Sequence, residues 1–240
     1  AGITVLTSQR FGAEDMRGMR RSVASAGMIA IAATIILTAI SLLGMHRLLV
    51  LMNTPDDIFD DAYRYIMIIC AGILVQALYN LFACILRALG NSKVPLYFLL
   101  FSASMNIILD LVSIIVLKMG VAGAAYATVI SQGVSAVLCF IYMVKKVPIL
   151  HLTREDFHVE GRLIKNQLAV GLPMAFQYSI TAIGTTMVQM ALNTLGSTYV
   201  AAFTAASKCE QMAGQAYIAL GSAMATFAAQ NVGAGRYDRV

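Results

Sequence analysis

The sequence predicts an all-α protein, a bundle of membrane-spanning helices, and three observations lead to this fold class. First, 59% of the 240 residues are hydrophobic and only 12% are charged, about half the charged fraction of an ordinary soluble domain. Second, the mean hydropathy is +0.77, and apolar runs of about 20 residues, enough to cross a bilayer as a helix, follow one another along the chain. Third, basic residues gather in alternate loops between these runs. A soluble enzyme of ordinary build is therefore excluded.

The apolar runs predict five full spans and a longer sixth that contains Lys208 and Glu210. Residues 1–8 would be the tail of an earlier span. Turn residues at 90–93 and 119–120 separate successive spans, and Pro173 predicts a kink inside the fifth. The predicted spans are residues 23–43, 62–86, 95–117, 121–144, 167–192 and about 199–229.

The basic residues also predict the orientation in the membrane. Four, two, five and two of them, 13 of the 17, lie in the alternate loops 10–21, 87–93, 145–165 and 233–240. The other loops hold three, and Lys208 lies within a span. Because cytoplasmic loops carry the excess of Lys and Arg, we expect these four segments in the cytoplasm and residues 46–61 and 193–198 outside. The net charge of +5 is then a topology signal rather than a sign of nucleic-acid binding. A multi-pass protein of the plasma membrane, in a prokaryote the cytoplasmic membrane, is expected.

A short internal repeat supports a two-lobe organisation. Residues 9–13 read Gln-Arg-Phe-Gly-Ala and residues 230–234 read Gln-Asn-Val-Gly-Ala, an offset of 221. Six spans separate the copies, so the repeats run parallel about an axis along the membrane normal, as in many secondary transporters. We therefore expect an excerpt of a protein with two six-helix lobes. Residues 1–143 would form most of the first lobe, 144–165 a cytoplasmic linker, and 166–240 the start of the second lobe.

The third full span contains an acid, Asp110, with Asn106 one turn earlier on the same face. An ionisable residue inside a membrane is costly and is usually functional. In the next span, Thr128 is as many residues from its outer end as Asp110 is from its own, so we expect the two at one depth. Their oxygens suit Na⁺ or a proton. The alternative is that Asp110 is only hydrogen-bonded between packed helices.

Further polar residues lie in the spans and are candidates for the lining of a cavity. Gln76 and Asn80 share one helix face, Gln132 lies in the 121–144 span, and Glu210 lies in the last span. Hydrogen bonding between helices is the alternative role. The four cysteines and three histidines have no ligand spacing, so no metal other than a coupling Na⁺, and no cofactor, is expected.

Several motifs together resemble the multidrug and toxic compound extrusion (MATE) family of transporters, over nearly the whole chain. Individually these motifs are weak, but their order and spacing agree with the family. They are Gln9-x-x-Gly12-Ala13, Leu86-Arg87-Ala88-Leu89-Gly90-Asn91-Ser92, Asn106-x-x-x-Asp110, Gly120-Val121-Ala122-Gly123-Ala124-Ala125-Tyr126-Ala127-Thr128, Gly171-Leu172-Pro173 and Gln230-Asn231-x-Gly233-Ala234-Gly235. On this resemblance the chain covers the end of helix 2 through helix 8.

The resemblance implies a twelve-helix monomeric antiporter that exports drugs, mainly organic cations, in exchange for Na⁺ or H⁺. In the branch related to the DNA-damage-inducible F protein, a cation site would use Asn106, Asp110 and Thr128. Asn80 matches an Asn near that site, and a helix-1 Asp would precede residue 1. The acid that another branch carries on helix 7 is missing from residues 167–192, and Glu210 fits neither pattern.

Three other classes of protein compete with this interpretation. A lipid-linked oligosaccharide flippase of the same superfamily should place several Arg or Lys in its cavity, whereas the spans hold one clear interior cation, Lys208. An intramembrane enzyme would need a paired catalytic set that the spans lack. A purely structural membrane protein would have no use for Asp110. The exporter is therefore the leading hypothesis and the flippase the alternative.

Overall fold

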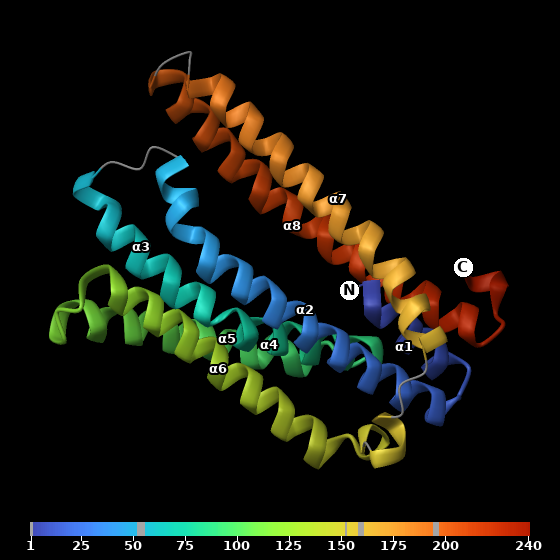
Figure 1. The fold of residues 1–240 in the computed structure, drawn as a ribbon. Helices are drawn as coiled ribbons and strands as arrows, with labels where there is room; N and C mark the ends of the chain where they lie inside the picture. The colour runs from blue at the N-terminus through green and yellow to red at the C-terminus, as the bar shows by residue number, and fades with distance from the viewer. Residues whose placement is uncertain (1, 52–55, 152, 158–160, 194–196) are drawn as a thin grey trace. The chain divides into compact units, whose positions relative to one another are not determined.

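The computed structural model describes residues 2–51, 56–151, 153–157, 161–193 and 197–240, and these ranges contain helices and no β-strand. The α-helices are α1 (Gly2–Gly12), α2 (Met16–Leu51), α3 (Asp56–Ala71), α4 (Ile73–Ala88), α5 (Lys93–Leu111), α6 (Gly120–Lys146), α7 (Gly161–Asn193) and α8 (Ser197–Gly233) (Figure 1). The π-helix η1 (Val112–Val116) follows α5, and short 3-10 turns form η2 (Pro148–Leu150), η3 (Arg154–Phe157) and η4 (Tyr237–Arg239). The predicted all-α class is confirmed. The predicted loops 46–61 and 193–198 and the linker 144–165 each include residues outside the described ranges.

Each predicted span lies within helical structure, although not all are equally apolar. Met16–Arg47, Lys93–Val116 and Gly120–Lys146 are long and apolar enough to cross a membrane. The predicted span 62–86 is not straight, because α3 and α4 meet at an angle of 44° around Gly72. Helices α7 and α8 have 33 and 37 residues but are not among the described helices apolar enough to pass that test. Their hydroxyl side chains, such as Thr181 and Thr185, donate to carbonyls one turn back, which satisfies them within the helix.

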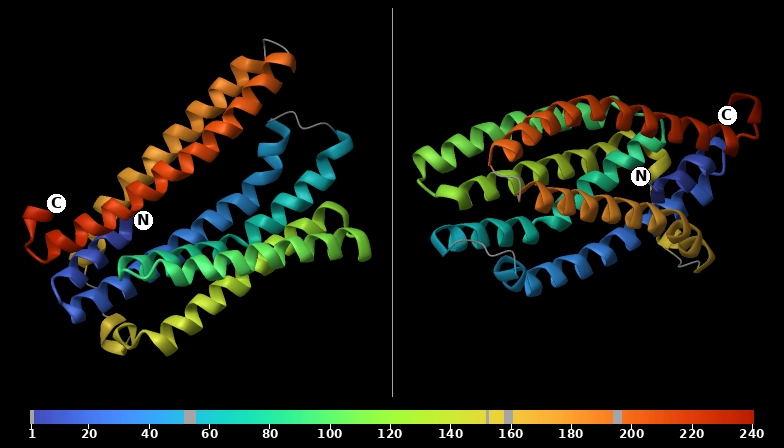
Figure 2. Two further views of the ribbon diagram at one scale, coloured as in Figure 1. Left: turned by 180° about the vertical axis from the view of Figure 1, so that it is seen from behind. Right: turned by 90° about the horizontal axis from the view of Figure 1, so that it is seen from above.

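The chain forms two compact units, of which one contains residues 16–158. Within it α6 contacts α3, α4 and α5, while α2 packs on α3 and α4 (Figure 2). Small side chains on α6 allow these close approaches: five of them are no more than 2% exposed, namely Ala125, Ala127, Ser131, Ser135 and Cys139. This packing orders the helices around the candidate site.

The outer face of α2 is apolar and open. Ile36, Ile40 and Leu43 are 58%, 62% and 85% exposed. So large a continuous apolar surface is not typical of a soluble monomer. An apolar helix face of this kind suits contact with lipid or with further apolar helices.

The segment after α6 is tied to the start of α2 through a buried carboxylate. Asp156 is 6% exposed and accepts hydrogen bonds from the Thr153 backbone N–H (2.8 Å) and hydroxyl (2.9 Å). Its Oδ2 lies 3.6 Å from Arg20 Nε. Burial alone raises the pKa of Asp156, but the Thr153 hydrogen bonds and the charges of Arg20 and Arg21 lower it further, so the net pKa lies below its ordinary value.

The second unit contains residues 1–15 and 159–240. In it α1 packs against both α8 and α7, and α7 and α8 contact each other (Figure 1). Leu163 and Gln167, in the first turns of α7, are 3% and 1% exposed. The short α1 is therefore part of a three-helix arrangement with the two longest helices of this unit.

Candidate cation site and polar pocket

One face of α5 and η1 carries the polar side chains that the sequence singles out. Ser102 and Ser113 are 5% and 8% exposed. Between them, Asn106 Nδ2 and Asp110 Oδ1 are buried, and neither has a hydrogen-bond partner among the described residues. A buried polar atom without a partner loses its hydration without compensation. Asp110 Oδ1 can therefore take a cation or a proton, whereas Asn106 Nδ2 can only donate to a further polar group.

The helix changes its form directly after Asp110. Residues Val112–Val116 form the π-helix η1, closed by a hydrogen bond of 3.0 Å from the Leu117 N–H to the Val112 carbonyl. Single π turns inside α-helices are rare and occur frequently at functional sites. The wide turn is not a feature that hydrophobic spacing predicts. The π-helix begins two residues after Asp110, which makes this stretch of α5 and η1 a candidate site.

Three contacts fix the antiparallel register of α5–η1 against α6. Ser102 Oγ donates to the Ser131 carbonyl at 2.8 Å, and Ser135 Oγ donates to the Phe98 carbonyl at 3.0 Å. Near the turn, Gly123 lies so close to Ser113 that a Cβ on the glycine would be 2.8 Å from the serine Cβ. The hydroxyls thus join the two helices without a charged side chain.

This register places Thr128 level with Asn106 and one helical turn from the level of Asp110. Counting from the predicted span ends put Thr128 level with Asp110 itself. The difference arises from the π-helix Val112–Val116 and the turn after it, where Lys118 and Gly120 have φ values of +50° and +58°. The Thr128 hydroxyl donates to the Ala124 carbonyl at 3.0 Å. Its oxygen retains lone pairs that can accept a proton or hold a cation.

A polar pocket of about 200 Å³ lies between α4, α5 and α6. It brings together three of the four predicted cavity residues, Gln76, Asn80 and Gln132. The Asn80 side-chain amide donates to the Gln76 carbonyl at 2.9 Å. The remaining lining residues are Tyr79, Leu99, Ser102 and Ser135. Ser102 lies one turn before Asn106, so the pocket adjoins the polar face of α5.

Tyr79 is the pocket residue that the sequence analysis missed. It lies three residues after Gln76 and next to Asn80, so the i, i+3, i+4 spacing of one helix face would have identified it. Its hydroxyl donates to the Pro95 carbonyl at 3.3 Å, which connects α4 to the start of α5. Glu210, the fourth predicted cavity residue, is exposed on α8 and does not line this pocket.

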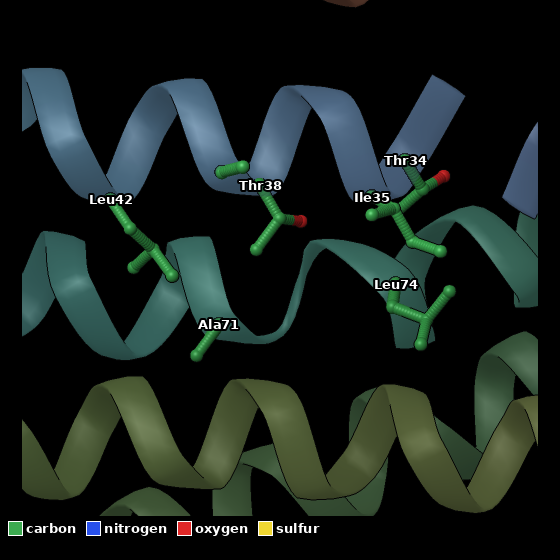
Figure 3. Close-up of a pocket in the computed structure, with 7 residues that line it drawn as sticks. Thr34, Ile35, Thr38, Leu42, Ala71 and Leu74 are labelled. Carbon is green, nitrogen blue, oxygen red and sulfur yellow. The ribbon is translucent and has the colours of Figure 1, made fainter. Parts of the chain in front are cut away.

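A second pocket, of about 330 Å³, lies beside the bend between α3 and α4 (Figure 3). Thr34 and Thr38 of α2 face it, and Thr38 Oγ1 is buried without a hydrogen-bond partner among the described residues. The other lining residues are aliphatic: Ile35, Ala39, Leu42, Ala71 and Leu74. Such a lining has too few polar groups to hold an ion. The candidate cation site therefore stays with α5 and α6.

Long apolar helices with an unpartnered carboxylate oxygen between them define a polytopic membrane protein with a polar site. The chain belongs to the MatE family, whose model matches residues 1–112 and 173–240. The resemblance predicted from the sequence motifs is thereby confirmed. The family consists of transporters and not of enzymes, and the chain is part of a multi-pass protein of the cytoplasmic membrane.

Individual relatives agree with this assignment. The whole chain aligns with "Probable multidrug resistance protein YpnP" of Bacillus subtilis at 32% sequence identity, and the alignment covers 53% of that protein. It also aligns with "Probable multidrug resistance protein NorM" of Thermotoga maritima at 27% sequence identity. This alignment covers 78% of the chain and 41% of that protein. The fold is similar to a solved structure, the outward-facing conformation of a multidrug resistance MATE family transporter of the MOP superfamily. The match covers 99% of this chain and 53% of the transporter's chain, with 26% sequence identity and a TM-score of 0.89. The chain spans about half the length of the curated relatives it matches.

Proposed function

We propose that the chain forms about half of a secondary antiporter that exports small organic compounds in exchange for Na⁺ or H⁺. The observation that carries this proposal is the pair of buried, unpartnered atoms Asn106 Nδ2 and Asp110 Oδ1. They lie beside a polar pocket in a family whose named relatives include multidrug resistance proteins. Transport would proceed by alternating access around a central cavity, in a monomer of two six-helix lobes with boundaries near residues 143 and 166.

Asp110, Asn106 and Thr128 would form the coupling site of this half. A carboxylate, an amide oxygen and a hydroxyl are hard ligands that suit Na⁺. A carboxyl group can also accept and release a proton, which would suit coupling to H⁺. Asp110 would bear the charge, Asn106 would turn its amide toward the ion, and Thr128 would contribute its hydroxyl oxygen from α6.

The substrate would enter the polar pocket through its hydrogen-bonding groups. Gln76, Asn80 and Gln132 offer neutral amides, and about 200 Å³ accommodates only part of a drug-sized molecule. The rest would lie in the central cavity, where Glu210 of α8 is a further candidate for contact with organic cations. The lining of this pocket holds no Lys or Arg that could bind a pyrophosphate. The pocket therefore does not favour the flippase alternative.

The test of the coupling site is the variant Asp110→Asn in the whole transporter. It keeps the size of the side chain and removes its charge, so we expect normal insertion but loss of ion-gradient-driven efflux of a fluorescent organic cation. Thr128→Ala should weaken Na⁺ dependence if Na⁺ is the coupling ion and should matter less if H⁺ is.

Ser104→Ala is the matched control, because Ser104 lies on the same helix, is exposed and bonds only the Leu100 carbonyl of its own helix. It should transport at the wild-type rate. Wild-type efflux with unchanged ion dependence in Asp110→Asn, at matched membrane abundance, would reduce Asp110 to a structural role.

A further inference from the structure

The two copies of the internal repeat contact each other through their glycines. A Cβ on Gly12 would overlap the carbonyl oxygen of Gln230, and a Cβ on Gly233 would overlap the carbonyl oxygen of Gln9. Each glycine of one copy therefore faces the glutamine backbone of the other. Residues 9 and 230, and residues 12 and 233, are both separated by the repeat offset. We call this reciprocal contact between α1 and α8 the glycine crossing.

The ends of the two helices repeat the same hydrogen bonds. The Asp15 N–H donates to the Arg10 carbonyl at 3.0 Å, and the equivalent Arg236 N–H donates to the Asn231 carbonyl at 2.9 Å. This bond over five residues is typical of the Schellman end of a helix. A contact in which each side presents the same surface to the other has local two-fold symmetry. The glycine crossing thus lies on the axis that relates the repeats.

The position of this axis gives the contact a role. Basic residues follow both helix ends, among them Arg17 and Arg239, and the charge distribution predicts that these ends lie in the cytoplasm. In the proposed two-lobe transporter the central cavity would lie on this axis, and it would open to the cytoplasm only when the two helix ends separate. No side chain lies between the backbones at the two glycines, so the contact closes tightly and separates without unlocking interdigitated side chains.

We propose that the glycine crossing is the cytoplasmic closure of the transport cavity. It is in contact while the cavity faces outward and separates when the cavity opens inward. This inference rests on the proposed alternating-access function. It names Gly12 and Gly233 as the positions where any side chain would hold the closure apart.

The first test measures the closure directly, without transport. Ser8, next to Gln9, is 2% exposed, so Ser8→Cys reports whether the helix ends have parted. The background is the whole transporter with its native cysteines replaced. Gly12→Ala and Gly233→Ala should each raise the rate at which a membrane-impermeant thiol reagent on the cytoplasmic side labels this cysteine. Overpacking strain on the closed state predicts an increase of about five-fold or more.

Gly221→Ala is the matched control, because it changes the same helix α8 where a new Cβ would meet nothing within 4 Å. Its labelling rate should equal that of the parent. If the two glycine variants also label at that rate, the crossing does not close the cytoplasmic side and the proposal is wrong.

The second test keeps the wild-type glycines and joins the helices covalently. In a Gln9→Cys, Gln230→Cys protein, a short bifunctional thiol reagent should abolish efflux, whereas the same protein treated with a monofunctional reagent should still transport. Undiminished efflux in the cross-linked protein would make the crossing a fixed pivot and overturn the proposal. A failure of the proposed function looks different: the untreated protein would then show no ion-driven efflux, while Ser8→Cys labelling would still test the closure.

Discussion

Glu14 occupies a backbone conformation that favours glycine. Its φ is +56°, and the equivalent position in the second copy of the repeat is Gly235 with a φ of +69°. Both residues end a helix in the left-handed region, where a side chain clashes with the following carbonyl. The first copy therefore bears a strain that the second avoids.

Replacing Glu14 by glycine should relieve this strain. We expect Glu14→Gly to raise the free energy of unfolding by about 0.5–1 kcal/mol, since the relieved clash exceeds the extra entropy of the unfolded chain. Equilibrium unfolding in mixed micelles would measure it. Ala13→Gly is the control: it adds the same entropy without relieving a positive φ and should destabilise. A loss of stability in Glu14→Gly would contradict the assignment.

The Asp156 contact with Arg20 predicts a pH dependence. Because the folded pKa of Asp156 is lowered, its stabilising contribution is complete above the pKa of the unfolded chain. It is lost as the pH falls through the lower folded pKa. The protection factors of the amides of residues 153–157, that is, their exchange rates corrected for the intrinsic pH dependence of exchange, should therefore fall only at acidic pH. Asp156→Asn should remove this pH dependence, and Glu155→Gln, at an exposed position in the same turn, should leave it unchanged.

At this scale the sequence predicts residue types well and their surroundings less well. The i, i+4 spacing correctly identified Asn106 and Asp110 as neighbours on one face, and the repeat motif identified the two glycines. The sequence could not show that each glycine contacts the glutamine backbone of the other copy, because contacts between residues 218 and 224 positions apart depend on packing. Nor could it place Thr128, whose level depends on the π-helix and the turn after it.

The break between α3 and α4 shows how a close contact shapes an element. Gly72 lies against Val129 of α6, where a Cβ on the glycine would overlap the valine Cγ2. The α3–α4 segment can thus approach α6 only where a side chain is missing. Hydropathy predicted one span over residues 62–86, but it contains no information on such a contact, and the bend of 44° was not predicted.

Gly72→Ala should test this reason for the bend. The added methyl group must displace Val129 or the helix, so we expect a loss of about 1–3 kcal/mol in the free energy of unfolding. The double variant Gly72→Ala, Val129→Ala should lose less than the sum of the two single variants. Gly27→Ala, where a Cβ would meet nothing within 4 Å, should be neutral or slightly stabilising. An additive double variant would show that the two residues do not compete for the same space.

At the scale of the whole molecule, the charge bias predicts the topology and remains to be measured. Single cysteines at the exposed positions Asp60 and Glu155 should react with an impermeant thiol reagent from opposite sides of the membrane. Position 60 should react from outside and position 155 from the cytoplasm. The reverse result would invert the topology and place the glycine crossing at the outer surface.

The fold class and the family were predictable because both depend on patterns that extend along the whole chain. Helix length, apolar content and the order of the motifs each tolerate errors at single residues. The polar pocket could be predicted only in part: Gln76, Asn80 and Gln132 were found, while the packing of α4 against α5 and α6 that encloses them was not. Helices α7 and α8 were predicted from length and turns, although neither is as apolar as α2, α5 or α6.

The reciprocal geometry of the glycine crossing has a consequence for the ancestry of the chain. Each copy of the repeat carries both a glycine and the backbone that receives one, so a single ancestral copy would have been self-complementary. Two identical six-helix proteins could therefore have paired through this contact before a gene duplication joined them. Once joined, the two halves no longer need identical sequences, and Glu14 and Gly235 differ at equivalent positions although both helix ends keep the glutamine and the glycine of the contact.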